Sequence, residues 1–163
     1  MNINMNKKMS YLINNIEHLN SDEIFEFNLK KLNGLMIPNF VQVYDCIIIS
    51  KKPLYILKEN FKKAVLMHTD KIGYEAGNTE IRINDYVESI NNSVQGMLQI
   101  ALIVIECWLN KLKNIDKTSK FCFIISCDNE NVTIRFHKVR ENEKMWISKE
   151  LEEYKEPVGY IIE

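Results

Sequence analysis

The chain has 163 residues, of which 46% are hydrophobic and 26% are charged; this is ordinary globular composition, with enough length to bury a core. Its net charge of −1 gives no overall field that would attract nucleic acid or anionic lipid, and no basic cluster is interleaved with aromatic residues. We therefore expect a single domain over residues 1–163 that binds neither nucleic acid nor membrane.

The N-terminus and the cysteines both favour a cytoplasmic protein. Residues 1–13 lack the uninterrupted apolar segment and the small-residue cleavage site of a secretory signal. The cysteines show no CxxC spacing and lie in apolar or strand-like segments, as buried reduced thiols do. They are Cys46, Cys107, Cys122 and Cys127. We expect no disulfide framework, no metal site and no cofactor.

The first third of the chain alternates between helix and strand signals. Residues 8–19 place apolar side chains at helical spacing and predict a short amphipathic helix. Residues 23–32 are ambiguous, because the alternation of Phe25 and Phe27 favours a strand while Asn20 with Glu23 resembles a helix capping box; we favour the strand. After a break at Asn33 and Gly34, residues 41–50 are rich in β-branched side chains and predict a central strand.

A second helix is predicted to begin at Pro53 and to end near His68. His68 is a lone histidine on the apolar edge of this helix, so we interpret it as a structural residue rather than a ligand. Gly73 and Gly77 are interpreted as flanking a loop, which leads into a strand over residues 78–83.

The most apolar segment of helical length covers residues 93–112. At 100° per residue its apolar side chains form a wide face, and its polar ones form a narrow stripe. The apolar face contains Val94, Met97, Leu98, Ala101, Val104, Ile105, Trp108 and Leu112. Leu102 falls within the polar stripe, where a single leucine is ordinary. Because Gln95, Gln99, Glu106, Asn110 and Lys111 interrupt the segment, it predicts a buried central helix and not a membrane span.

The clearest hairpin signal lies in residues 120–139. Segments 120–127 and 131–139 alternate as strands do and flank a four-residue turn at 128–131. Pairing Cys127 with Val132 puts Ile125 opposite Ile134 and Phe123 opposite Phe136 on one face, which we expect to meet the central helix. On the other face the same register puts Ile124 beside Arg135 and Cys122 beside His137.

The last residues add a short helix over 149–155, with Ser148 as its N-cap, and a terminal strand over 158–162. The predicted fold is therefore α+β, with a mostly antiparallel sheet packed on a long central helix and additional N-terminal helices.

Catalytic motifs are absent from the sequence. It contains no GxGxxG, GxxxxGK[ST], HExxH or GxSxG pattern. Cys122 and His137 are the one thiol and imidazole that the predicted register brings together, so a small enzyme using this pair is an alternative hypothesis. The pair lacks a third orienting residue and an oxyanion site. We therefore predict that the protein is not an enzyme.

The C-terminal segment 133–162 resembles immunity proteins of bacterial polymorphic-toxin or contact-dependent growth inhibition systems. The residues that carry the resemblance are Arg135, Phe136, His137, Arg140, Glu143, Trp146, Ile147, Leu151, Glu152 and Tyr154. The resemblance implies a small cytosolic protein that binds a cognate toxin and blocks its active or docking surface. A subunit of another complex is a further possibility.

The resemblance and the local charge both indicate residues 141–163 as a candidate binding region, because this segment contains seven acids and only three lysines. If the toxin acts on nucleic acid, its substrate surface is basic, and an acidic inhibitor surface would pair with it. The candidate partner-binding residues are Glu141, Glu143, Trp146, Glu150, Glu152, Glu153, Tyr154 and Glu156. Solvation of the acids and packing of both aromatics on the sheet are the structural alternatives. For Arg135 and Arg140 we expect salt bridges to Glu141, Glu143 or Glu80.

Overall fold

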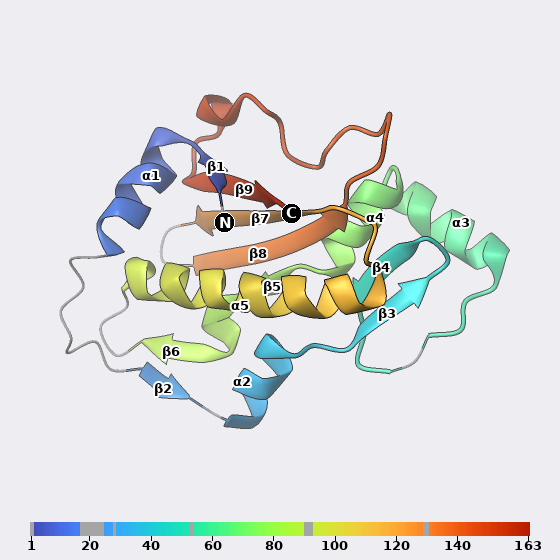
Figure 1. The fold of residues 1–163 in the computed structure, drawn as a ribbon, viewed down its shortest axis with the longest axis horizontal. Helices are drawn as coiled ribbons and strands as arrows, with labels where there is room; N and C mark the ends of the chain where they lie inside the picture. Colours follow the sequence, from blue (N-terminus) through green and yellow to red (C-terminus); the bar gives the residue numbers. More distant parts are fainter. Residues whose placement is uncertain (1, 17–24, 28, 53, 90–92, 129–130) are drawn as a thin grey trace.

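A computed structural model describes residues 2–16, 25–27, 29–52, 54–89, 93–128 and 131–163 (Figure 1). The described chain is α+β, as the sequence predicts, and its main sheet has five antiparallel strands in the order β1-β9-β7-β8-β5. These strands are β1 (Ile3–Met5), β9 (Val158–Ile162), β7 (Phe121–Asp128), β8 (Asn131–Lys138) and β5 (Ile81–Arg82).

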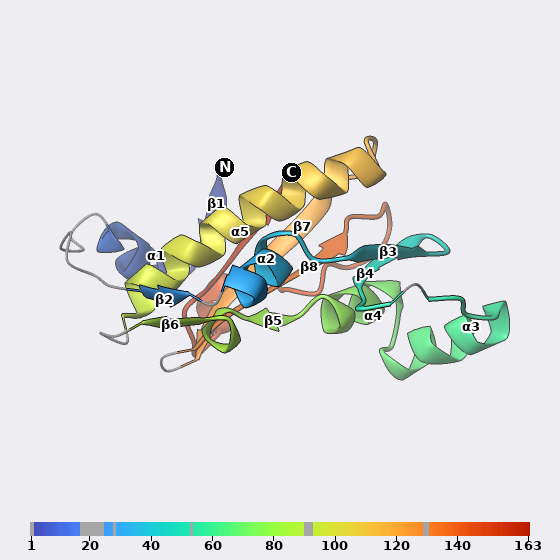
Figure 2. The ribbon, with the colours of Figure 1, turned by 90° about the horizontal axis from the view of Figure 1, so that it is seen from below.

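The remaining elements surround this sheet (Figures 1 and 2). Two small ribbons pair β2 (Phe25–Phe27) with β6 (Val87–Ser89) and β3 (Phe40–Val43) with β4 (Cys46–Ile49). The α-helices are α1 (Lys7–Asn14), α2 (Leu29–Met36), α3 (Lys58–Met67), α4 (Lys71–Asn78) and α5 (Val94–Ile115). Two 3₁₀ turns are η2 (Ile83–Asp85) and η3 (Leu151–Glu153). Figure 2 shows α5 lying along the sheet and α3 projecting at one end of the molecule.

Helix α5 contains most of the segment that hydrophobic periodicity predicts as a helix. Ser93 caps it, because its hydroxyl accepts a hydrogen bond of 3.1 Å from the Gly96 N–H. The predicted apolar face is buried except for Val94, which is partly buried. Trp108 on this face is fully inaccessible and donates its indole N–H to the Leu35 carbonyl at 2.8 Å. Among the described residues, no helix is both long and apolar enough to cross a membrane.

The β7–β8 hairpin has the register predicted from the sequence. Cys127 pairs with Val132, Ile125 with Ile134, Phe123 with Phe136 and Cys122 with His137. The alternation places Phe123, Ile125, Ile134 and Phe136 in one core cluster with α5. The expected contact between the central helix and this face of the hairpin is confirmed.

The predicted central strand over residues 41–50 is wrong. The structure has a two-strand hairpin there, in which Val43 pairs with Cys46 across a turn at Tyr44 and Asp45. Tyr44 has a φ of 56°, which a bulky residue seldom adopts. The sequence gives no sign of the turn, because the Gly or Asn that usually marks such a turn is absent at this position. Tertiary contacts hold it there: its ring lies 4.7 Å from that of Phe61, and its hydroxyl donates to the Ile56 carbonyl at 3.1 Å.

The predicted loop between Gly73 and Gly77 is also wrong, since both glycines lie inside α4. A Cβ on Gly73 would overlap the backbone carbonyl of His68, and one on Gly77 would lie 3.0 Å from the His68 ring. The glycines therefore permit close packing rather than a turn. Because α4 runs to Asn78, the strand expected over 78–83 shrinks to Ile81–Arg82.

Several predicted boundaries shift. The first helix ends at Asn14, and residues 17–19 of its predicted range lie outside the described residues. The favoured strand within 23–32 is present as Phe25–Phe27, but α2 follows it and runs through the expected break at Asn33 and Gly34.

Two further predicted helices are shorter than expected. The helix expected from Pro53 begins only at Lys58, and Pro53 itself lies outside the described residues. The C-terminal helix expected over 149–155 is the single 3₁₀ turn η3. Strand β1, which the sequence did not suggest, pairs with β9 and brings the two ends of the described chain together.

Candidate functional site

Residues 139–157 form an irregular segment, here called the arm, which connects β8 to β9 and has η3 as its one regular turn. The arm lies on the sheet face opposite α5. Its Ile147 and Leu151 are buried there in a cluster with Cys122, Ile124 and Val158. These anchors fix the arm on the sheet although it has little secondary structure.

His137 holds the start of the arm. Its Nδ1 lies 3.1 Å from the Lys138 carbonyl oxygen, which only accepts, so Nδ1 carries the proton and donates. Its Nε2 then accepts from the Trp146 backbone N–H at 3.3 Å. Burial lowers the pKa of His137, since the fully buried ring loses the hydration that would stabilise its cation. The neutral ring is thus the form that fits the arm.

Arg140 ties the arm to α4 and to the β3–β4 hairpin. Its guanidinium donates to both carboxylate oxygens of Glu75, at 2.8 and 2.9 Å, and to the Asp45 carbonyl at 3.0 Å. Glu75 is fully buried and also accepts from the backbone N–H groups of Ile47 and Lys138, at 2.9 Å each. Burial opposes the charge on Arg140, but the bonds to Glu75 outweigh it and raise the pKa of Arg140.

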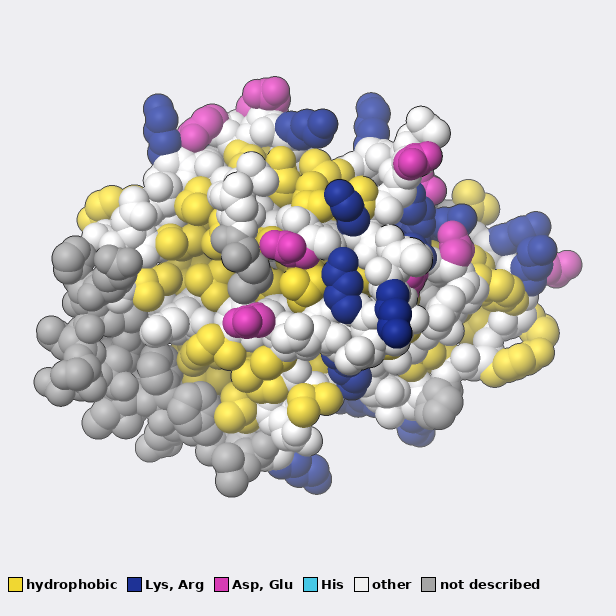
Figure 3. Space-filling view, viewed as in Figure 1, with side chains coloured by type: hydrophobic (Ala, Val, Ile, Leu, Met, Phe, Trp, Pro, Cys, Tyr) yellow, Lys and Arg dark blue, Asp and Glu magenta, His cyan; other side chains and the backbone are white. Residues whose placement is uncertain are grey.

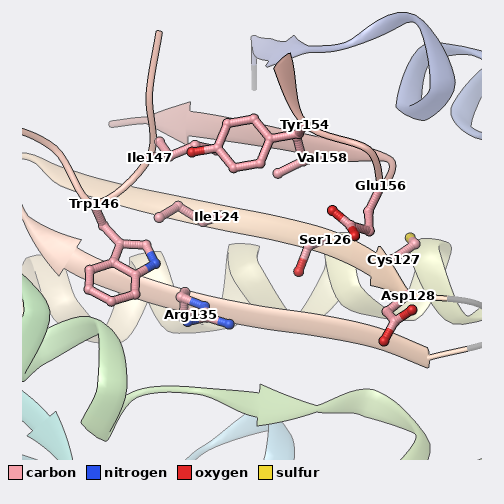
Figure 4. Close-up of a pocket in the computed structure, with 10 residues that line it drawn as sticks. All are labelled: Ile124, Ser126, Cys127, Asp128, Arg135, Trp146, Ile147, Tyr154, Glu156 and Val158. Atoms are coloured by element: carbon pink, nitrogen blue, oxygen red, sulfur yellow. The ribbon is translucent and has the colours of Figure 1, made fainter. Parts of the chain in front are cut away.

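A cavity of about 280 Å³, here called the arm pocket, opens between the arm and the outer face of the sheet (Figure 4). It is lined by Ile124, Ser126, Cys127, Asp128, Arg135, Trp146, Ile147, Tyr154, Glu156 and Val158. Arg135 lies 5.8 Å from the Trp146 ring centre and pairs with Glu80 at 2.9 Å, as one of the expected salt bridges. The Tyr154 hydroxyl accepts from the Ser148 N–H at 3.0 Å and so fixes one wall.

The structure brings together three of the eight residues that sequence reasoning proposed for partner binding: Trp146, Tyr154 and Glu156 all line the arm pocket. The other five acids do not line it. They are Glu141, Glu143, Glu150, Glu152 and Glu153, all with exposed side chains on the arm. Glu152 accepts from the Lys7 N–H at 3.0 Å, and Glu143 lies 4.0 Å from Arg140.

Sequence reasoning missed Ser126 and Asp128 as neighbours of Trp146 and Glu156. Both belong to β7, and Ser126 alternates with the core residues in the same way as Ile124 does. The correct hairpin register therefore contained a signal for Ser126, because it identifies the outward-facing positions. Nothing local in the sequence indicated that the arm would fold back over them.

The Cys122–His137 pair is in register but is not arranged for nucleophilic catalysis. Both residues are fully buried, and burial raises the pKa of the Cys122 thiol to about 12, so it carries no thiolate near neutral pH. Both ring nitrogens of His137 are engaged with backbone groups. Among the described residues, no group of three His, Cys, Asp or Glu side chains could hold a metal ion.

Fold and site together define an α+β protein whose outer sheet face is covered by an anchored, acidic arm beside a small pocket. The chain belongs to the family described as "Uncharacterized protein PM0498 family", which matches residues 4–162. No curated protein and no solved structure matches it.

Proposed function

We propose that this chain is a cytoplasmic immunity protein that binds a cognate bacterial toxin and blocks its active or docking surface. The observation that carries the proposal is the exposure of Trp146, a residue that remains 47% accessible on the anchored arm. Tryptophan is among the residues most enriched at the energetic centres of protein interfaces. Inhibition by binding requires no catalytic residue, metal or cofactor in this chain.

Charge on the arm supports a basic partner. The six glutamates of the arm are exposed and lie on both sides of Trp146 in the sequence. A toxin that acts on nucleic acid needs a basic substrate surface, and an acidic inhibitor would be steered toward that surface and would pair with it.

The anchoring of the arm supports tight binding. Ile147 and Leu151 are buried against the sheet, while Arg140 fixes the arm to Glu75 through two hydrogen bonds. A surface that is already ordered in the free protein loses less conformational entropy when it binds. The resemblance of segment 133–162 to immunity proteins covers this same part of the chain.

Co-expression with the product of the adjacent upstream gene tests the proposal. We expect that product to be toxic alone and harmless when this chain is present, and the two proteins to co-purify. A product that is not toxic, or whose toxicity persists, overturns the proposal. Stable co-purification with a non-toxic protein would instead favour a subunit of another complex.

A matched pair of aromatic substitutions locates the binding surface. Trp146→Ala is expected to weaken toxin binding at least thirtyfold, the effect of removing a central interface aromatic. Tyr55→Ala is the control, because Tyr55 is 94% exposed and lies outside the arm; it is expected to change binding less than twofold. Equal binding by both variants would place the interface elsewhere, and thermal unfolding of each verifies that it is folded.

A further inference from the structure

The arm pocket has two chemically different ends (Figure 4). Trp146 and Arg135 lie at one end, whereas Ser126, Asp128 and Glu156 lie at the other. Ile124 and Val158 supply apolar surface between the ends. A ligand that fills the pocket therefore needs an apolar stem and one polar head.

The charged side chains that line the arm pocket determine which charge the polar head of a ligand should carry. Arg135 already has a counter-charge, since its guanidinium pairs with Glu80 at 2.9 Å. Within the described part of the chain, neither Asp128 nor Glu156 forms an ion pair, and both side chains are exposed to whatever enters the pocket. The available charge is thus negative, and it is concentrated at the end away from Trp146.

We propose that the arm pocket binds a single arginine or lysine side chain of the partner protein, with the cationic head at Asp128 and Glu156. The identification of the partner as a toxin rests on the proposed function, whereas the chemistry of the pocket does not. The stem of either side chain has three or four methylene groups, which would lie on Ile124 and Val158. Carboxylates recognise guanidinium groups through short, charge-assisted hydrogen bonds.

The size of the cavity agrees with a side chain rather than a cofactor. Its volume of about 280 Å³ is just below the range of roughly 300–1,000 Å³ that is typical of small-molecule sites. The Ile147 and Tyr154 wall is fixed by burial and by the bond from the Ser148 N–H, so the pocket exists before the partner arrives.

The test uses a single-residue probe and the two tryptophans of the chain. N-acetyl-arginine amide is titrated into the ¹⁵N-labelled full chain, with N-acetyl-citrulline amide as the neutral probe of the same shape. We expect the Trp146 indole resonance to shift saturably with the arginine probe, while that of the fully buried Trp108 stays constant. The shift should be absent with citrulline and should weaken as salt rises.

Charge-removing variants complete the test. Asp128→Asn with Glu156→Gln should weaken arginine binding at least tenfold. Glu59→Gln with Glu106→Gln removes the same charge from exposed positions outside the pocket and should leave binding within twofold. The proposal is overturned if Trp146 does not respond, if citrulline binds equally well, or if the first variant binds as the unmodified chain does.

These outcomes are separable from those of the toxin experiment. A chain that neutralises the toxin but does not bind the arginine probe retains the proposed function and loses the pocket assignment. A chain that binds the probe but neutralises no toxin retains the pocket assignment and loses the proposed function.

Discussion

The two faces of the main sheet are built from the same strands but are covered in different ways. On one face α5 packs against Phe123 and Phe136, both of which are fully buried. On the other face the arm covers Cys122 and Ile124 with two anchors, Ile147 and Leu151, and leaves the arm pocket beside them. A helix presents a continuous row of side chains and closes a face completely, whereas an irregular segment closes it at points and leaves room for a ligand.

The two outer surfaces also differ in charge. The view onto α5 shows Lys and Arg side chains gathered toward its C-terminal end, while hydrophobic side chains with some acidic ones among them lie over the middle of this face (Figure 3). Residues 141–163 behind it carry seven acids and three lysines. A basic partner is therefore favoured on the arm side and disfavoured near the end of α5.

Phe136→Ala should have the largest effect on stability, because it removes a ring at the centre of the α5 face. Phe136 makes edge contacts with Phe40, Trp108 and Phe121, at centroid distances of 5.5, 6.1 and 6.0 Å. We expect a loss of about 3–5 kcal/mol in the free energy of unfolding, measured by urea denaturation. Phe136→Leu should lose less, and a loss below about 1 kcal/mol for the alanine variant would contradict the central position of Phe136 in the core.

Glu75→Gln tests the ionic anchor of the arm. It should lower the free energy of unfolding by about 3 kcal/mol, because it leaves the Arg140 guanidinium without its buried counter-charge. Glu143→Gln is the control. Glu143 lies 4.0 Å from the same guanidinium and is partly solvated, so its loss should stay within about 0.5 kcal/mol. Equal losses in the two variants would show that Glu75 is not the dominant partner of Arg140.

Ile147→Ala compares the arm face directly with the α5 face. We expect a loss of about 2 kcal/mol, the lower end for such a substitution, because the adjoining arm can settle into the space. Amide exchange should accelerate in residues 139–157 and remain slow in α5. A loss as large as that of Phe136→Ala, or faster exchange throughout the sheet, would mean that both faces are equally rigid.

The smallest expected effect is a pH dependence that arises at the base of the arm. The pKa of His137 is lower in the folded chain, so the unfolded chain takes up its proton first as the pH falls. Stability should therefore be highest above the unfolded value of about 6.5 and should decline as the pH falls below it. A proton on Nε2 would also face the Trp146 N–H, donor against donor.

Urea midpoints measured between pH 8 and pH 5 check this sign, with His137→Asn as the control that should flatten the slope. Asp116 does not contribute to the pH dependence of stability in this range. Its hydrogen bond to Lys138 and its bonds to Ser119 hold its pKa below its ordinary value of 3.8, outside the window. An unchanged slope in the His137→Asn variant would remove His137 as the cause.

Parts of the fold with local signals were predictable. The apolar periodicity of α5 and the alternation of β7 and β8 depend on neighbours in the sequence, and they gave the helix, the register and the face that the helix covers. The Arg135–Glu80 pair was also among the expected salt bridges. The sequence also identifies Trp146, Tyr154 and Glu156 as candidates for partner binding, but it does not indicate the pocket that they share.

Tertiary structure alone decided the turn at Tyr44, the helical conformation of Gly73 and Gly77, and the pairing of Arg140 with Glu75. Tyr44 adopts its unusual φ because contacts with Phe61 and Ile56 hold it, and the glycines are needed because His68 packs against α4. Arg140 and Glu75 are 65 residues apart, and only the packing of α4 against β8 brings them together. Periodicity records which side of an element faces the core, but it carries no information about which distant segment will cover the other side.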